Sequence, residues 1–224
     1  TSGLTTTIAF SADFPDSYND KGQLFHYQET KSEQGLGLDV TTQTERSAIT
    51  YNAAGQMSSY TETSDKDGQA KTTTIRSGIA YNSLGQLKYY TDTIIQEGLA
   101  LETTITFGFD KTPSVNAPVE PVYDIKGRLS DYTESKYEES TDAQRPLEIL
   151  TVTKRSSITY NAFGQMSSYS EDVSKDGQAD TTTNRSSITY NSLGQLRAYQ
   201  DTITSSATSG LTTTIAFSAD FPDS

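Results

Sequence analysis

A seven-residue motif, Tyr-Asn-x-x-Gly-Gln-Leu, recurs along this chain of 224 residues and constrains its fold more than any other feature. Glycine always occupies the fifth position, the seventh is always Leu or Met, and a second tyrosine follows nine residues after the first. The six copies begin at Tyr18, Tyr51, Tyr81, Tyr123, Tyr160 and Tyr190, and their second tyrosines are Tyr27, Tyr60, Tyr90, Tyr132, Tyr169 and Tyr199. Such self-similarity indicates a repeat architecture, in which each unit is stabilised by its neighbours.

The motifs are grouped into larger repeats. Residues 51–94 match residues 160–203 at an offset of 109, and residues 1–17 are identical to residues 208–224 at an offset of 207. We therefore expect one repeat array over 1–224, with half-units of about 1–102 and 103–207 and with 208–224 as the start of the next period. On this hypothesis the chain is a piece of something longer; a duplicated tag is the alternative explanation of the identical segments.

The spacing Asn-x-x-Gly predicts the tip of a β-hairpin. A type I turn followed by a glycine at positive φ forms a common three-residue loop, and Asn in the first turn position can accept a hydrogen bond from the backbone two residues on. In the last copy the loop would be residues 192–194, with Asn191 opposite Gln195. We expect positive φ at Gly55, Gly85, Gly127, Gly164 and Gly194.

Extending this register along the hairpins pairs opposite charges. The rule places Tyr190 opposite Leu196, Ile188 opposite Ala198, and the second tyrosine of four hairpins opposite a small residue: Ala48, Gly78, Ser157 or Ser187. The predicted ion pairs are Arg46–Glu62, Arg76–Asp92, Arg155–Glu171 and Arg185–Asp201. The copies at Tyr18 and Tyr123 lack such a pair, so their hairpins need not be identical to the other four.

The segments between hairpins also predict strands and turns. Asp-Gly in "DKDGQ" (65–69) and "SKDGQ" (174–178) is a tight-turn signature, and the threonine runs at 72–74, 181–183 and 212–214 favour strands. The sequence therefore predicts an all-β fold of tandem antiparallel β-hairpins, joined into a long coiled or spiralling meander sheet. A sheet of about a dozen strands is expected to coil, to close or to stack.

The fourth copy, "YDIKGRL" at 123–129, resembles the YD repeat of Rhs proteins, insecticidal toxin-complex shells and teneurins, whose core reads Tyr-Asp-x-x-Gly-Arg-Leu. The other five copies have Asn in place of Asp and Gln in place of Arg. The resemblance implies β-hairpins joined into a long spiralling sheet, often a hollow shell or barrel.

Composition narrows the functional classes. With 29 acidic and 17 basic residues the net charge is −12, which disfavours nucleic acid and anionic membrane surfaces as partners. The chain has no cysteine, hence no disulfide and no thiolate chemistry, and no apolar run long enough to span a membrane. We expect an extracellular or cell-surface location.

No group of residues predicts a catalytic, cofactor-binding or metal site, and we expect no enzymatic activity. His26 is the only histidine, so a structural or exposed role is favoured. Asp65, Asp67 and Gly68, like Asp176 and Asp180, resemble a calcium loop only faintly, and turn chemistry is favoured. The remaining weak candidates are the glycosylation triplet 184–186, the threonine runs as an ice- or polysaccharide-binding face, and Glu138 with Glu139 in a charged, loop-like stretch at 134–145.

The hypothesis that best fits these patterns is structural. We expect a segment of a long repeat protein that forms a fibre, stalk or tubular sheet. Its partners would be neighbouring repeats of the same or an identical chain, joined end to end through open β edges at residues 1–17 and 208–224. The alternatives are a YD-type shell around a toxin or other cargo, and an adhesin surface that binds cell-surface glycans or ice.

Overall fold

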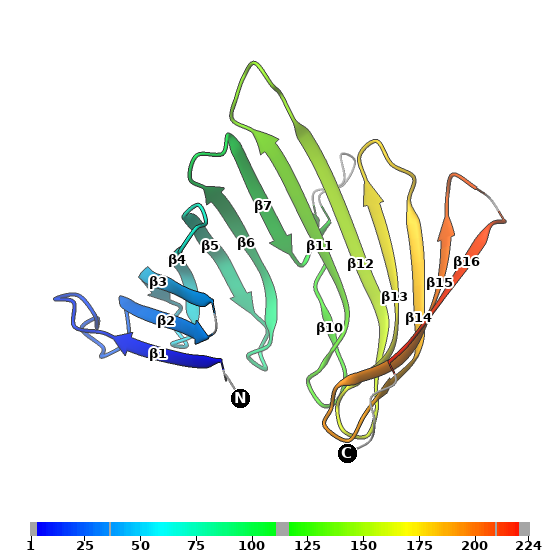
Figure 1. Cartoon of the computed structure of the whole chain (residues 1–224), viewed down its shortest axis with the longest axis horizontal. Helices are drawn as coiled ribbons and strands as arrows, with labels where there is room; N and C mark the ends of the chain where they lie inside the picture. Colours follow the sequence, from blue (N-terminus) through cyan, green and yellow to red (C-terminus); the bar gives the residue numbers. More distant parts are fainter. Residues whose placement is uncertain (1–3, 36, 111–116, 209, 220–224) are drawn as a thin grey trace. The chain divides into compact units, whose positions relative to one another are not determined.

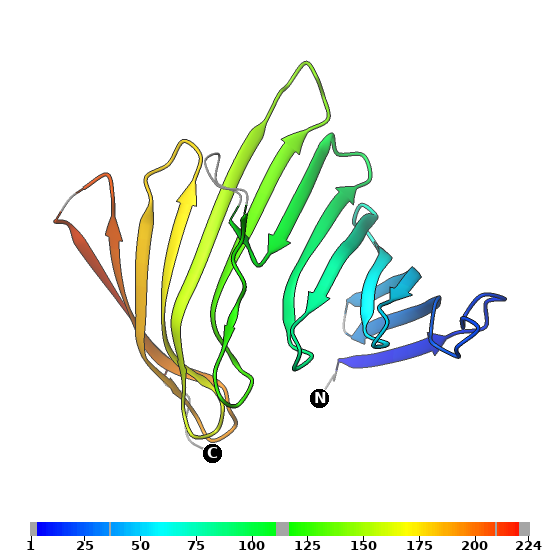
Figure 2. The same ribbon diagram turned by 180° about the vertical axis from the view of Figure 1, so that it is seen from behind.

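The computed structural model describes residues 4–35, 37–110, 117–208 and 210–219, and every regular element within these ranges is a β-strand (Figures 1 and 2). The strands are β1 (Thr5–Ser11), β2 (Tyr27–Gly35), β3 (Leu38–Tyr51), β4 (Met57–Lys66), β5 (Thr72–Tyr81), β6 (Leu87–Gln96), β7 (Leu101–Phe107), β8 (Phe109–Asp110), β9 (Ala117–Pro118), β10 (Val122–Tyr123), β11 (Leu129–Ser140), β12 (Glu148–Tyr160), β13 (Met166–Lys175), β14 (Thr181–Tyr190), β15 (Leu196–Ser205) and β16 (Thr212–Ser218). The described chain contains no helix that could cross a membrane.

Strands of the main sheet follow one another in chain order. Among the described residues the sheet has 14 strands, ordered β1 to β7 and then β11 to β16, with β10 paired to β11; β8 and β9 form a separate two-stranded sheet. Consecutive strands are antiparallel, and β1 and β16 are the two ends of an open sheet. The predicted all-β antiparallel meander is thus confirmed, and it does not close into a barrel. Its coiling stays a prediction.

The chain forms two compact units. The first comprises residues 1–82, 90–105 and 138–148, and the second comprises residues 83–89, 106–137 and 149–224. Within the first unit, β1 to β5 lie side by side in chain order, coloured blue to cyan in Figure 1. Within the second unit, β12 to β16 do the same, coloured yellow-green to red.

The hairpin tips form as the motif predicts. In the last copy the Gly194 amide donates to the Asn191 carbonyl at 3.0 Å, and the Asn191 amide donates to the Gln195 carbonyl at 2.9 Å. The copies that begin at Tyr18, Tyr51, Tyr123 and Tyr160 make the same two bonds. The five glycines predicted to have positive φ have values between 77° and 80°. The tip register is therefore confirmed, including Tyr190 opposite Leu196.

In the β3–β4, β12–β13 and β14–β15 hairpins the register changes a few residues before the tip, and there the sequence prediction was partly wrong. Arg185 lies opposite Asp201 as expected, but Thr189, and not Ile188, lies opposite Ala198. Ser187 has φ of 56°, so the first strand carries one extra residue there, and the partner strand recovers the register with its own extra residue before Leu196. This is a β-bulge. The equivalent residues Ala48, Gly78 and Ser157 also have positive φ, between 51° and 62°.

The Asp-Gly turns are confirmed, and their aspartates bond each turn to a neighbouring strand. Gln69 donates its amide to the Lys66 carbonyl, and Gln178 does the same to Lys175. The Asp67 carboxylate accepts a hydrogen bond from the Thr41 amide at 2.8 Å, while the Asp67 amide donates to the Thr41 carbonyl at 3.0 Å. Asp176 makes the same two bonds with Leu150. Each turn is thereby attached to the preceding long strand, β3 or β12.

Few side chains are fully buried. The buried apolar residues of the described chain are Ile49, Phe107, Val152 and Ile158. Ile49 and Ile158 occupy equivalent positions, each directly after the positive-φ residue of its bulge. Most other strand residues are half-buried, as is usual when stability comes from contacts between neighbouring strands and not from one large core.

Candidate functional site

The first tyrosine of each motif links its hairpin to the hairpin before it. The Tyr51 hydroxyl donates a hydrogen bond to the Leu24 carbonyl, the seventh position of the preceding motif, at 2.5 Å. The same bond joins Tyr81 to Met57, Tyr123 to Leu87, Tyr160 to Leu129 and Tyr190 to Met166, at 2.6–2.9 Å. These five tyrosines are half-buried, whereas Tyr18 is 58% exposed. We call this bond the tyrosine clip.

The second and sixth motif positions form a matched pair across each tip. In the last copy the Asn191 side-chain oxygen accepts from the Leu193 and Gln195 amides, and its side-chain nitrogen donates to the Gln195 side chain at 2.8 Å. In the fourth copy Asp124 accepts the same two kinds of backbone bond, and the Arg128 guanidinium donates to its other oxygen. Asn–Gln pairs an amide with an amide and Asp–Arg pairs a carboxylate with a guanidinium, so the two are versions of one contact.

The second tyrosine of each motif belongs to a row that crosses the sheet. In the first unit the row runs through Tyr27, Arg46, Tyr60, Arg76 and Tyr90, one residue from each of β2 to β6. The guanidinium carbons lie 5.7 and 4.3 Å from the ring centroids beside Arg46, and 5.6 and 3.8 Å from those beside Arg76. Each arginine is therefore held between two tyrosine rings by cation–π contacts.

The second unit repeats this row in β11 to β15. Tyr132, Arg155, Tyr169, Arg185 and Tyr199 alternate with spacings of 5.7, 4.4, 5.6 and 3.8 Å. Phenylalanine rings contact the tyrosines at the ends of these rows. The ring centroids are 5.3 Å apart for Phe10 and Tyr27 in the first unit, and 5.6 Å for Phe107 and Tyr132 and 5.2 Å for Phe217 and Tyr199 in the second. We call each of these rows a tyrosine–arginine ladder.

All four predicted Arg–carboxylate pairs are confirmed. Arg76 donates to both oxygens of Asp92 at 2.7 and 2.6 Å, and Arg185 does the same to Asp201. Arg46 and Arg155 instead direct two donors to a single oxygen of Glu62 and Glu171. The two aspartates are 6% exposed, so they depend on their arginines, whereas the glutamates are only half-buried.

The pKa shifts within the ladders favour the charged arginines and the neutral tyrosines. Hydrogen bonding to Asp92 raises the pKa of the Arg76 guanidinium, and Asp201 raises the pKa of Arg185 in the same way. Burial raises the pKa of the Tyr60 and Tyr132 hydroxyls, so these tyrosines stay neutral. Arg76 and Arg185 therefore stay charged near neutral pH.

His26 is a structural histidine with two acidic partners. Its ring stacks on Phe14 at 3.8 Å, its Nδ1 lies 3.1 Å from Asp16 Oδ1, and its Nε2 lies 2.9 Å from Glu45 Oε1. Its side chain is 14% exposed. Burial favours the neutral ring, but the hydrogen bonds to Asp16 and Glu45 outweigh it and raise the pKa of His26 above its ordinary value.

The described residues hold no cluster of three or more potential metal ligands, including around His26, Asp65, Asp67, Asp176 and Asp180. Asn184 lies within β14 beside Arg185, and the threonine runs lie in β5, β14 and β16. Glu138 and Glu139 correct the sequence prediction, because they belong to the strand β11 and not to a loop. A strand can carry this charge because alternate side chains point to opposite faces of the sheet.

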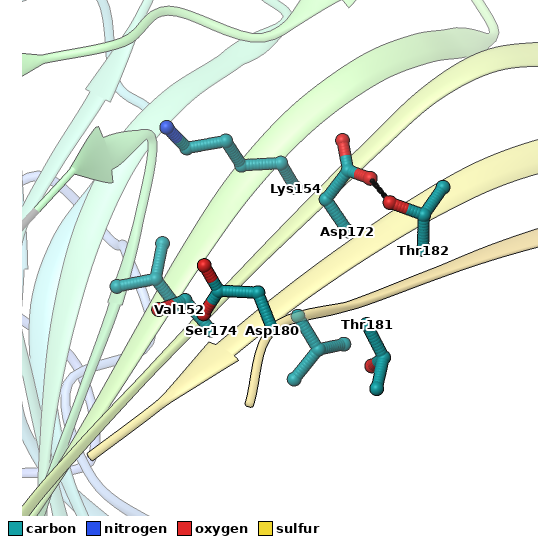
Figure 3. Close-up of a pocket in the computed structure, with 8 residues that line it drawn as sticks. Val152, Lys154, Asp172, Ser174, Asp180, Thr181 and Thr182 are labelled. Carbon is teal, nitrogen blue, oxygen red and sulfur yellow. Dashed lines mark hydrogen bonds between the residues drawn. The ribbon is translucent and has the colours of Figure 1, made fainter. Parts of the chain in front are cut away.

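A pocket on the second unit lies over β12 to β14 (Figure 3). Val152, Lys154, Asp172, Ser174, Asp180, Thr181 and Thr182 line it and are labelled there. Asp172 accepts a hydrogen bond from Thr182 at 2.6 Å, and Lys154 forms an ion pair with Asp110 at 2.7 Å. Within the pocket Asp172 and Thr182 therefore bind each other, while Lys154 is held by Asp110, which lies outside the lining.

Sequence reasoning missed two arrangements: the tyrosine clips and the cation–π contacts of the ladders. A signal was present, because Arg46, Arg76, Arg155 and Arg185 each precede a motif tyrosine by five residues. Comparisons with protein-family models, with curated proteins and with solved structures found no match for this chain.

Proposed function

We propose that this chain is a structural segment of a long extracellular or cell-surface repeat protein, in which successive hairpins build a fibre, stalk or tubular sheet. The observation that carries the proposal is that the repeated tyrosines make contacts between neighbouring hairpins. The first tyrosine bonds to the preceding hairpin, and the second stacks on arginines of neighbouring strands. Residues that recur in every copy therefore join hairpin to hairpin.

The resemblance of the motif to YD repeats supports the coarser part of the proposal, an array of joined hairpins. The fourth copy carries Asp124 and Arg128, and the other copies replace this pair by Asn and Gln in the same tip geometry. The departure of five copies from the YD sequence therefore leaves the hairpin unchanged. An array of such hairpins suits a spacer or fibre because each hairpin needs only its neighbours.

Tandem proteins with one, two and three copies of residues 1–207 test the proposal. The main sheet from β1 to β15 has twelve strands per period, so each added period contributes up to roughly 58 Å of sheet at about 4.8 Å per strand. We expect the maximum dimension from small-angle X-ray scattering to rise by a similar step with each copy. A shell that encloses cargo predicts instead a dimension that stops growing once the sheet closes, and this result would contradict the fibre.

A further inference from the structure

One seven-residue strand occurs twice in this chain with two different neighbours. β1 and β16 have the same sequence, "TTTIAFS", at an offset of 207. β1 pairs with β2, placing Ile8 opposite Lys31 and Phe10 opposite Glu29. β16 pairs with β15, placing Ile215 opposite Asp201 and Phe217 opposite Tyr199.

The two pairings use opposite edges of the strand. Phe217 opposite Tyr199 matches Arg76 opposite Tyr60, the contact of a strand with the hairpin before it. Phe10 opposite Glu29 matches Arg46 opposite Glu62, the contact of a strand with the strand after it. The interior strand β5 makes both kinds of contact, one on each edge. A strand of this sequence can therefore have β15 on one edge and β2 on the other.

The phenylalanine of this strand likewise contacts a tyrosine on only one side in each copy. Phe10 contacts Tyr27 and is 57% exposed, while Phe217 contacts Tyr199 and is 38% exposed. Combining the two contacts would place one phenylalanine between two tyrosines, as each ladder arginine already is. The exposed Tyr18 would gain a clip as well, since Leu196 is the seventh residue of the motif that would precede it and is itself exposed.

We propose that β16 of one chain takes the place of β1 in a second copy of the chain, so that copies join head to tail by strand replacement. This inference rests on the proposed array and names its joint. Ile215 would lie opposite Lys31 of the second copy, Phe217 would stack on Tyr27 of the second copy, and Tyr18 of the second copy would donate to the Leu196 carbonyl.

Replacement keeps the number of strand pairs constant. Before it, β16 pairs with β15 and the second copy's β1 pairs with its β2; afterwards β16 pairs with both, and that β1 is released. The new tyrosine clip favours replacement, while the high effective concentration of the attached β1 opposes it. The unaltered chain is therefore expected to stay mostly monomeric, and it joins readily once one copy of the strand cannot pair.

Matched proline variants test this joint. Successive residues of an antiparallel strand direct their amides to opposite neighbours, so two consecutive prolines remove a donor on each edge. Ile8→Pro with Ala9→Pro frees the β2 edge and leaves β16 as donor; Ile215→Pro with Ala216→Pro frees the β15 edge and leaves β1 as donor. By sedimentation, each variant should reach a mass about twofold or more above the monomer, rising with concentration. The variant with all four prolines should stay monomeric.

These outcomes separate strand replacement from general edge association. Association of the four-proline variant to the same extent as the other two, or monomeric two-proline variants, would overturn the proposal. A peptide with the sequence of residues 1–17 should return the Ile8→Pro, Ala9→Pro variant to the monomer, and the same peptide with both prolines should not.

Disulfide trapping tests the same joint without proline substitutions, so its result does not depend on whether the proline variants fold. The chain has no cysteine, so Ile215→Cys in one chain and Lys31→Cys in another can form only new disulfides. We expect a linked dimer, because directly opposite strand residues lie within disulfide range. Ile215→Cys mixed with Ser83→Cys at a hairpin tip is the control, and equal yields from both mixtures would overturn the joint. Failure here with stepwise growth of the tandem proteins would reject strand replacement and leave the array standing.

Discussion

At the scale of single residues, the bulge that precedes four of the tips is the point at which backbone conformation limits the choice of side chain. Three of its four positive-φ positions carry Ala48, Ser157 and Ser187, and the fourth carries Gly78. The left-handed region costs a non-glycine residue about 1–2 kcal/mol. The residue that follows the bulge is buried in two of the four hairpins, as Ile49 and Ile158, and half-buried in the other two.

Exchanging the residue types at equivalent bulges tests this explanation. Ala48→Gly should stabilise the protein, and Gly78→Ala should destabilise it, each by about 1 kcal/mol. A methyl group added at Gly78 meets no atom within 4 Å, so its effect reports the backbone alone. Urea unfolding measures both free energies, and a change of the same sign in the two variants would contradict the assignment.

His26 gives the chain a pH-dependent contact. Its raised pKa means that the protonated ring is bound more tightly in the folded protein, between Asp16 and Glu45. The stabilisation is therefore complete below the unfolded pKa of about 6.5 and is lost as pH rises through the folded pKa. We expect the melting temperature to fall across this window, and His26→Gln to remove that fall. NMR titration of this single histidine checks the direction, and a pKa below 6.5 would contradict it.

At the scale of elements, each ladder arginine joins three strands, and its partner sets its importance. Arg76 neutralises the buried Asp92, whereas Arg46 pairs with the half-buried Glu62. Removing one partner of a buried pair leaves an uncompensated charge, which costs about 3–5 kcal/mol, while an exposed pair contributes about 0–1 kcal/mol.

We therefore expect Arg76→Ala to lower the free energy of unfolding by about 3 kcal/mol, and Arg46→Ala to lower it by about 1–2 kcal/mol including the lost ring contacts. Arg185→Ala and Arg155→Ala should repeat this difference in the second unit. Urea unfolding of the four variants measures it. Adding Asp92→Asn to the Arg76→Ala variant should recover part of the lost free energy of unfolding. No recovery would show that the buried charge is not the cause of the loss.

The hairpins illustrate what the sequence could and could not predict. Asn191 and Gly194 identify a tip because their local chemistry permits few other conformations, and the tip sets the pairing of Arg185 with Asp201. The bulge at Ser187 was missed because Ser has no intrinsic preference for the positive φ that it adopts there. The ladder was missed because it depends on strands from separate hairpins, whose contacts no single motif contains.

At the scale of the whole molecule, stability is distributed along the sheet. The described residues contain only four buried apolar side chains, and the recurring contacts join each strand to the next. A lesion in one hairpin is therefore expected to weaken its neighbours most and distant hairpins least, as in other linear repeat proteins.

The direction of the tyrosine clips has a consequence for how such a chain is made. Every clip observed runs from a later tyrosine to an earlier carbonyl, across 24 to 36 residues. When a hairpin leaves the ribosome, the preceding hairpin that accepts its tyrosine clip has already been synthesised. The clip therefore needs no segment that is still to be translated. Folding can keep pace with synthesis however many repeats follow, because the search that each new hairpin makes does not lengthen with the chain.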